Sequence, residues 1–430
     1  MIVFSWLALA LEYLFLLVMI SCMLYVVFTM LKRFWIYRVK PEGIFGSDWH
    51  MLRYYLSSGK KSYIFVDYEI QPSLSWQDIE SFVTAKLMAL LRLNQSPFSI
   101  TIDANQRRLK HRHVSNLSEI VEYHKKSSTF YQVTDAQLRD CVIRFYPEGH
   151  RVGVLFDHTL FDGILLSQEI GQPLLEYRAF SKGLLLQDKY WPIFSEVCQL
   201  YSLMRLAVSQ YASEALPIRS KQSQSVVHHN WDFSKVKTIK AKHDCSFSDA
   251  LLAFYVEYLF RHLESAHNTL RVGIVVGFKN PRFRNNYSVC RVRINRSSSV
   301  SDYLEQIKRE VKKNQHEVLP LYQVFSVHDL QSRFKSGLID CLFSPLFFFP
   351  KKGLSLHMRQ TRFFNVPTGC PLYVFANAFG DRVYCSTTIN TTAIDEASFV
   401  GDKGDLFSFN EDYSHMTTTE QAEDACISLP

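Results

Sequence analysis

The sequence predicts a protein of the α/β (α+β) class in which two lobes follow an N-terminal membrane segment. The chain has 430 residues, of which 47% are hydrophobic and 21% are charged, so it can bury two sizeable cores. Patterns typical of strands alternate with patterns typical of helices in both halves of the chain. We therefore expect five parts: a transmembrane anchor with a basic flank at 1–40, an N-terminal lobe at 41–216, a polar, irregular crossover linker at 217–232, a C-terminal lobe at 233–400 and a disordered acidic tail at 401–430.

The N-terminal segment has the properties of a membrane span. Residues 2–31 are almost wholly apolar, and Glu12 is their only charge. The uncharged run 13–31 is long enough to cross a bilayer, and it lacks the basic leader and the cleavage site of a signal peptide. Basic residues follow at once in 32–40, which predicts a single-pass anchor with the body on the cytoplasmic side, at the endoplasmic reticulum in a eukaryotic cell. A buried core helix is the alternative, and the length of the run and its basic flank weigh against it.

Charge and cysteine content exclude several classes of function. The net charge is +7, and much of the basic excess lies in short clusters such as Lys308-Arg309 and Lys312-Lys313. Such clusters are ordinarily solvated, or they attract anionic lipid headgroups or the phosphates of an acyl carrier. No recognition motif accompanies the charge, so we do not expect nucleic acid as a partner. The 9 cysteines include no C-x-x-C pair, which argues against a disulfide framework or a zinc site, and we expect no metal.

The remaining sequence supplies strands and helices for both lobes. In the N-terminal lobe we predict strands at 62–68, 141–146 and 151–156, a helix capped by Ser75, and further helices at 164–177 and 191–216. In the C-terminal lobe we predict a helix at 248–263, strands at 271–278 and 287–294, a helix at 300–315, an apolar segment at 339–350, and a hairpin of 370–379 with 381–389. We interpret His228 and His229, within the predicted linker, as incidental.

One stretch of the N-terminal lobe has the pattern of a catalytic motif. In VGVLFDHTLFDGI, residues 152–164, an apolar strand-like run ends at Asp157-His158, and Asp162-Gly163 follows. A histidine at the end of a strand is held rigidly and can face a cleft, which is the placement a general base needs. Asp162 is better suited to fixing the loop, and Gly163 permits a close turn into the next helix. A structural histidine with no catalytic role is the plainer interpretation of His158, and the strong hairpin before it favours the catalytic one.

The H-x-x-x-D-G pattern of His158, Asp162 and Gly163 resembles the motif of the CoA-dependent acyltransferase superfamily. Over residues 45–400 the sequence is most similar to the wax ester synthase/diacylglycerol acyltransferase family. There the motif usually begins with two histidines, and Asp157 stands in place of the first. Looser similarities lie at 47–54, at 245–254 with Asp249 kept and Ser248 in place of Asn, at 271–278 with Asn286 beyond it, and at 369–395. The resemblance implies a two-lobed fold like that of chloramphenicol acetyltransferase, with the histidine where the lobes meet and a tunnel through the molecule.

These observations lead to a hypothesis of acyl transfer. His158, with an ordinary pKa of about 6.5, would take the proton of an acceptor hydroxyl, which attacks the thioester of acyl-CoA. Acyl-CoA is then a co-substrate, no cofactor is needed, and a lipid alcohol in the membrane is the expected acceptor. A hydroxyl in the range 386–388 could stabilise the oxyanion, although a plain strand is the simpler interpretation there. A same-fold enzyme with a soluble or carrier-bound acceptor, and an inactive membrane-tethered binding module, stay open as alternatives.

Overall fold

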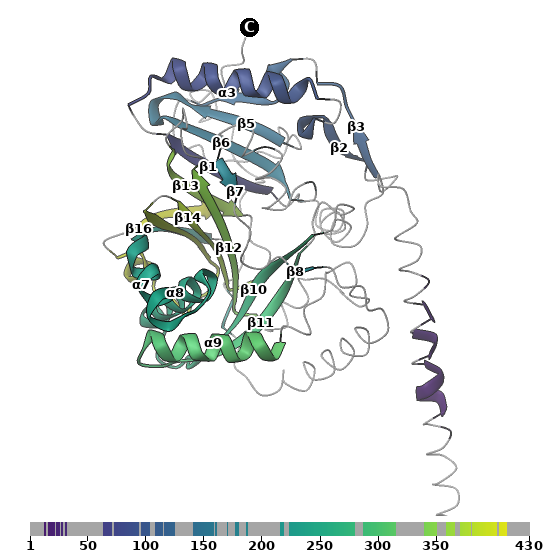
Figure 1. Ribbon diagram of the computed structural model, residues 1–430, viewed down its shortest axis with the longest axis vertical. Coiled ribbons are helices and arrows are strands. Elements are labelled where there is room, and N and C mark those ends of the chain that lie inside the picture. The colour runs from purple at the N-terminus through teal and green to yellow at the C-terminus, as the bar shows by residue number, and fades with distance from the viewer. Residues whose placement is uncertain are drawn as a thin grey trace, which may run out of the picture.

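The computed structural model describes helical residues between Tyr13 and Leu31, and then most of residues 63–124, 141–160, 216–314 and 339–410. Short segments at 170, 177–179 and 186–187 are also described. These residues form two lobes, each built on one β-sheet, with the N-terminal helical residues beside the body (Figure 1). The prediction of a two-lobed α/β protein is confirmed.

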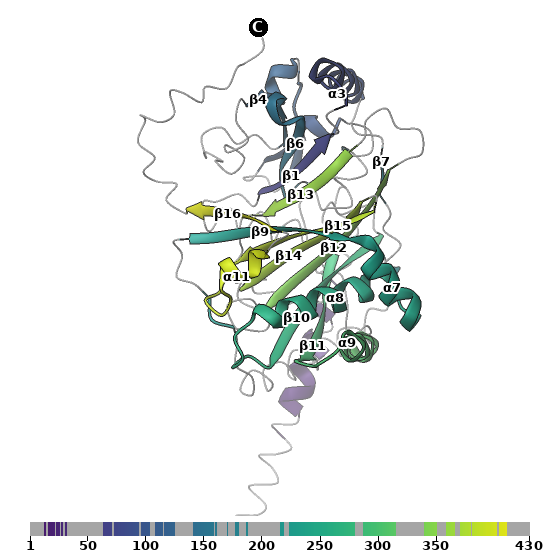
Figure 2. The same ribbon diagram turned by 90° about the vertical axis from the view of Figure 1, so that its left-hand side faces the viewer.

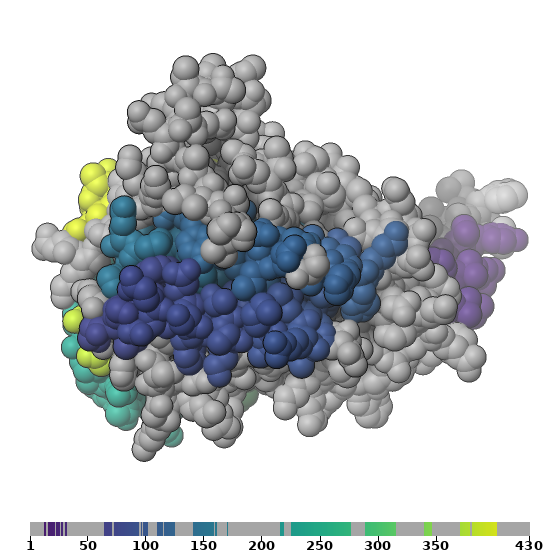
Figure 3. All heavy atoms as spheres, turned by 90° about the horizontal axis from the view of Figure 1, so that it is seen from above, coloured from purple at the N-terminus to yellow at the C-terminus, as the bar shows by residue number. Residues whose placement is uncertain are grey.

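The N-terminal lobe is a five-stranded sheet with one long helix on its outer face. The strand order is β13-β1-β6-β5-β4. The helix α3 (Trp76–Leu91) buries Ile79, Val83, Leu87 and Leu90, which recur at the helical spacing, and Ser75 caps it by accepting from the Asp78 amide. Side chains of α3 form part of the outer surface of this lobe (Figure 3). The strands are β1 (Tyr63–Ile70), β4 (Val121–Tyr123), β5 (Cys141–Tyr146), β6 (Arg151–Asp157) and β13 (Met358–Asn365); the pair β2 (Ile100–Asp103) and β3 (Arg108–His111) lies apart.

Two features of this sheet bear on the site. The predicted hairpin of β5 and β6 is confirmed, and its short 3-10 turn, Pro147–Gly149, ends at His150 with φ +48°. The edge strand β13 comes from the C-terminal half of the chain, yet it pairs antiparallel with β1. β13 also contacts β14 and β15 of the other sheet, so this strand joins the two lobes (Figure 2).

The C-terminal lobe is a nine-stranded mixed sheet with its helices on one face. Its main order is β11-β10-β12-β14-β15-β9-β16, with β7 beside β12 and β8 beside β10. The helices α7, α8, α9 and α11 lie on the side away from the N-terminal lobe (Figure 2). The elements are β7 (Tyr177–Ala179), β8 (Leu186–Gln187), β9 (Ser223–Asp232), α7 (Phe233–His243), α8 (Phe247–His262), β10 (Thr269–Lys279), β11 (Tyr287–Asn295), α9 (Val300–Asn314), β12 (Cys341–Pro350), β14 (Leu372–Phe379), β15 (Arg382–Ile389), α11 (Glu396–Val400) and β16 (Gly404–Asn410).

The two faces of this sheet pack against different partners. Along β14, Leu372, Val374 and Ala376 belong to the apolar core under the helices. Tyr373 and Phe375, which alternate with them, belong to the core of the N-terminal lobe. We call the side that carries Tyr373, Phe375 and, on β15, Tyr384 the interlobe face. This face is the side of the C-terminal sheet that packs against the N-terminal lobe.

Several sequence predictions fail at the two ends of the C-terminal lobe. The range 217–232 is not an irregular linker, because Ser223–Asp232 forms β9 inside the sheet. The range 401–430 is not wholly disordered, because Gly404–Asn410 forms β16 on the edge of β9. In both cases cross-strand pairing overrides a polar composition. The predicted helix 164–177 cannot include Tyr177, which begins β7; its other residues except Ile170, and the predicted helix 191–216 except Leu216, lie outside the described residues.

The predicted membrane anchor is described only in part. Among the residues that the structure describes, no helix has both the length and the apolar character to cross a membrane. The described residues of 1–40 are helical with gaps between them, and their apolar side chains are exposed, as with Leu17 at 61% and Met23 at 62%.

Candidate active site

His158 stands one residue beyond the end of β6. This strand lies between β1 and β5, and its last residue, Asp157, pairs with Tyr63 at the start of β1. The chain turns after His158, because the Leu160 amide donates to the carbonyl oxygen of Asp157 at 2.9 Å. The residue His158 is buried, with 8% of its surface exposed. His158 therefore lies directly after a central strand of this sheet, which is the position in the fold that the sequence predicts.

The residues on either side of the turn fix its position relative to the C-terminal lobe. Phe156 and Leu160 are fully buried. Both belong to the apolar cluster that also contains Phe375 and Tyr384 of the interlobe face. His158 thus lies between two residues of a core to which both lobes contribute.

The other predicted motif residues have different outcomes. Asp157 is 2% exposed at the end of β6. Asp249 lies in the first turn of α8, where its amide donates to Ser246 Oγ at 3.0 Å; the structure places it on the helix side of the C-terminal sheet, away from the interlobe face. Asp162, Gly163 and Asn286 lie outside the described residues.

A second polar group, which the sequence interpretation treated as incidental, lies in the C-terminal lobe. His228 on β9 and Ser386 on β15 occupy opposite register positions. His228 Nδ1 is 2.8 Å from Ser386 Oγ, and both residues are almost fully buried, at 4% and 3% exposed. Ser386 shares the side of β15 that carries Tyr384, which is the interlobe face. The sequence does contain a signal for the strand β9, since Val226, Val227 and Trp231 form a strand-like apolar pattern. The polar residues between them led to the prediction of a linker instead.

The three hydroxyls at 386–388 do not face the same way. Thr387 Oγ1 lies 2.9 Å from the hydroxyl of Tyr255 on α8, so it points to the helix side. Ser386 and Thr388 alternate with it and lie on the interlobe face. Of the three predicted oxyanion donors, Thr387 is therefore excluded by its direction.

Asn377 on β14 is a buried polar side chain of the interlobe face that lacks hydrogen bonds. It is 1% exposed and continues the alternation of Tyr373 and Phe375. Neither Oδ1 nor Nδ2 has a hydrogen-bond partner among the described residues. A buried amide left without partners costs roughly 1–3 kcal/mol. A group that completes these hydrogen bonds therefore stabilises the protein when it binds.

His229, next to His228 in sequence, points to the opposite side of the sheet and has a structural role. Its Nε2 lies 2.9 Å from the carbonyl oxygen of Phe399, and its ring stacks on Trp231 at 4.7 Å between centroids. Tyr258 donates its hydroxyl proton to the same carbonyl. Burial lowers the pKa of His229 to about 4, and the hydrogen bond to Phe399 opposes this only in part. His229 is therefore neutral at physiological pH, with its proton on Nε2.

Three buried cysteines of the C-terminal lobe are not prepared as nucleophiles. Burial raises the pKa of the Cys341 and Cys385 thiols, and it raises the pKa of Cys370 to about 12. A thiol needs a lowered pKa to react as a thiolate. No group of three or more potential metal ligands occurs among the described residues, which include His111 of the basic stretch 106–113.

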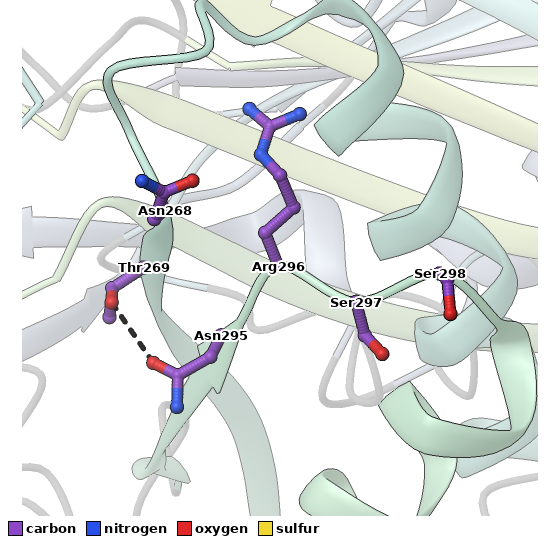
Figure 4. Close-up of a pocket in the computed structure, with 6 residues that line it drawn as sticks. All are labelled: Asn268, Thr269, Asn295, Arg296, Ser297 and Ser298. Carbon is purple, nitrogen blue, oxygen red and sulfur yellow. Dashed lines mark hydrogen bonds between the residues drawn. The ribbon is translucent and has the colours of Figure 1, made fainter.

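A surface pocket of about 530 Å³ lies elsewhere, beside the start of β10 and the end of β11 (Figure 4). Its lining residues are Asn268, Thr269, Asn295, Arg296, Ser297 and Ser298. The guanidinium of Arg296 donates to the carbonyl oxygens of Phe260, Leu263, Glu264 and His267, so it caps the end of α8. The guanidinium of Arg296 thus has a structural role, because main-chain carbonyl oxygens occupy it. We therefore do not take this pocket as the active site.

No protein-family model and no curated protein matches the sequence. Solved structures do match. A wax ester synthase/diacylglycerol acyltransferase from Marinobacter aquaeolei VT8 is 9% identical with a TM-score of 0.53, over 81% of this chain and 95% of that chain. The trichothecene 15-O-acetyltransferase TRI3 from Fusarium sporotrichioides is 12% identical with a TM-score of 0.56, over 82% and 91%. Polyketide synthase associated protein 5 from Mycobacterium tuberculosis is 10% identical with a TM-score of 0.51, over 84% and 96%.

At these identities the similarity concerns the fold alone. It covers both lobes, and the fold is the one that the H-x-x-x-D-G resemblance implied. The chain therefore shares its two-lobed fold with these two solved acyltransferases.

Proposed function

We propose that the protein is an acyltransferase that moves an acyl group from acyl-CoA to the hydroxyl of a lipid alcohol, such as a long-chain alcohol or diacylglycerol. The observation that carries the proposal is the position of His158: a buried imidazole directly after a central strand, between two residues of the core shared by the lobes. Solved acyltransferases with this fold support the reaction class.

In the proposed reaction, neutral His158 accepts the proton of the acceptor hydroxyl while the oxygen attacks the thioester carbonyl. A tetrahedral oxyanion forms, the carbon–sulfur bond breaks, and the proton passes from His158 to the leaving thiolate of CoA. The products are an ester and free CoA. General-base catalysis of this kind contributes about 100- to 10,000-fold. Asp162, in the loop after His158, is assigned to holding that loop.

Ser386 is our candidate for the oxyanion donor. It lies on the interlobe face, and His228 fixes its position through the 2.8 Å contact. If His228 Nδ1 carries the proton and donates it to Ser386 Oγ, the serine hydroxyl donates its own proton onward. A donor held in advance for the developing charge is the usual source of such stabilisation.

The N-terminal segment supports a lipid acceptor. A helix with exposed leucine, methionine and phenylalanine side chains needs an apolar partner, and the basic residues of 32–40 suit a headgroup layer. The described helical residues and α9 lie at the same end of the molecule in both ribbon views (Figures 1 and 2). The helix α9 carries the exposed cations Lys308, Lys312 and Lys313, of which Lys308 donates to the carbonyl oxygens of His243 and Asp244 at the end of α7. A soluble alcohol is the second candidate acceptor, since the Fusarium structure is named for a trichothecene 15-O-acetyltransferase.

The test is acyl transfer by the full chain in its membrane. Radiolabelled acyl-CoA is supplied with a long-chain alcohol, with diacylglycerol, or with soluble alcohols, to membranes holding wild type, His158→Ala, or His111→Ala, a substitution at an exposed histidine on β3. We expect labelled lipid ester with wild type and His111→Ala, and a loss of at least 100-fold with His158→Ala. Ester formation that survives in His158→Ala refutes the mechanism. Labelled product with soluble alcohols alone supports the second acceptor, and no product with any acceptor supports an inactive binding module.

A further inference from the structure

We infer that Asn377 is a binding residue for the secondary amides of a pantetheine arm, which it recognises inside the protein on the interlobe face. The inference rests on the proposed function, because acyl-CoA is the donor that would bring such an arm between the lobes. It adds the residue that distinguishes this donor from an acyl thioester without amides.

The first argument is the unsatisfied amide itself. Asn377 lies in the middle of the sheet, between β12 and β15, with Leu346 and Tyr384 at the opposite register positions. Asn377 is 1% exposed, and neither polar atom of its side chain has a hydrogen-bond partner among the described residues. Buried amides ordinarily have hydrogen-bond partners, because an unpaired amide has lost its hydrogen bonds to water without replacing them. A ligand that supplies a donor and an acceptor removes this penalty.

The second argument is the chemistry of the surroundings. On the same face, the neighbours of Asn377 are Phe375 on its own strand and Tyr384 on β15, both packed into the shared apolar core. Such a wall suits a chain that is mostly methylene groups.

The third argument is the match between ligand and side chain. Asn377 offers one acceptor, Oδ1, and donors on Nδ2. In a pantetheine arm, the β-alanyl unit carries an amide N–H and an amide C=O separated by two methylene groups. The N–H can donate to Oδ1 and the C=O can accept from Nδ2, with the methylene groups against the aromatic wall. Free CoA and a carrier protein present the same arm, so the shared chemistry is what Asn377 recognises.

The test measures binding without turnover. Affinities of the full chain are measured by titration calorimetry for three thioethers, which cannot transfer an acyl group: S-hexadecyl-CoA, S-hexadecyl-pantetheine, and hexadecyl 2-hydroxyethyl thioether, which has no amide. We expect Asn377→Leu to weaken the first two by a similar factor, roughly 10-fold, and to leave the third unchanged. An S-hexadecylated phosphopantetheinyl carrier protein, bound more tightly than S-hexadecyl-CoA, would identify the carrier as the source of the arm.

A matched control separates recognition from folding. Asn314 on α9 is also buried, but its Nδ2 donates to the carbonyl oxygen of Arg291 at 2.6 Å. We expect Asn314→Leu to lower the melting temperature without changing any of the three affinities. Asn377→Leu should leave the melting temperature of the ligand-free protein unchanged or raise it, because it removes an unpaired buried amide.

The outcomes are distinguishable. Equal affinities of wild type and Asn377→Leu for S-hexadecyl-CoA overturn this inference and leave the proposed function standing. Equal weakening of all three ligands means that the substitution changed the passage in general, which also overturns it. If wild type binds none of the ligands that carry amides, this inference fails together with the acyl-CoA donor.

Discussion

Asp340 holds Arg271 with both of its carboxylate oxygens. Oδ2 accepts from Nε at 2.8 Å, and Oδ1 accepts from Nη2 at 2.6 Å. The same carboxylate accepts from the amides of Arg271 and Leu216, at 2.8 and 3.1 Å. Asp340 is 1% exposed and stands at the entry to β12. One buried carboxylate thus fixes the start of β12 to β10 and to the chain that leads into β9.

We predict that Asp340→Asn lowers the free energy of unfolding by about 3 kcal/mol, because it leaves a largely buried guanidinium, 15% exposed, without its counter-charge. Denaturant unfolding of the full chain in detergent measures the change. The exposed pair of Glu257 and Arg261 on α8, 2.5 Å apart, is the control, and Glu257→Gln should cost less than about 0.5 kcal/mol. Equal effects of the two substitutions would contradict the assignment of Asp340 as a buried junction.

A second prediction concerns the pH dependence of stability. The pKa of His229 is about 4 in the folded protein and about 6.5 when unfolded. Between these values the unfolded chain binds a proton that the folded protein does not, so stability falls as pH decreases through this window. From about pH 7.5 to about pH 5, His229 should account for roughly 2 kcal/mol of this loss. Unfolding of wild type and His229→Phe at both pH values tests this: the variant keeps a ring against Trp231, and its loss should be smaller by that amount.

A third prediction tests the oxyanion donor. Ser386→Ala should lower kcat for ester formation about 100-fold with little change in KM, because a donor to the oxyanion acts mainly in the transition state. Thr387→Val on the same strand is the control, since its hydroxyl meets Tyr255 on the helix side. It should lower stability by about 1 kcal/mol and leave kcat unchanged. If kcat is the same in Ser386→Ala and wild type, Ser386 has only a structural role.

A fourth prediction addresses topology. Asn116 and Asn295 begin N-x-[ST] sequons and are exposed, whereas Asn390 begins one and is buried at 5% exposed. With the body in the cytoplasm, neither exposed sequon should carry a glycan in a eukaryotic cell. The same chain behind a cleavable signal peptide should gain glycans there, and digestion with an endoglycosidase followed by electrophoresis reports both results. Glycan addition to the native chain would contradict the cytoplasmic placement.

The sequence was informative where local pattern and tertiary context agree. The helices α3, α8 and α9 have apolar residues at helical spacing, Ser75 and Ser246 cap two of them, and all were predicted. The hairpins β5–β6 and β14–β15 were also predicted, because in each of them two β-type runs are separated by a turn. The strands β10 and β11 were predicted one by one, and the structure pairs them.

The sequence was uninformative where pairing between distant segments determines the local structure. β9 contains serine, histidine and asparagine, and it was taken for a linker; it is a strand because β15 and β16 satisfy its backbone on both sides. The helix α7 was not predicted, although Phe233 and Val236 are buried with a helical spacing. The site showed the same division. His158 follows from a local motif, whereas the meeting of His228 with Ser386 depends on a register that no short segment encodes.

The strand β13 has a consequence for synthesis of the protein. β1 emerges from the ribosome early, but the strand that covers its outer side, Met358–Asn365, is made only after most of the chain. Until then the edge of β1 is open to pairing with another chain. The strand that pairs with this edge in the folded protein belongs to the distant C-terminal half of the same chain. Expressing either half alone should therefore yield an aggregating fragment, and co-expression of the halves should restore solubility only if the second contains Met358–Asn365.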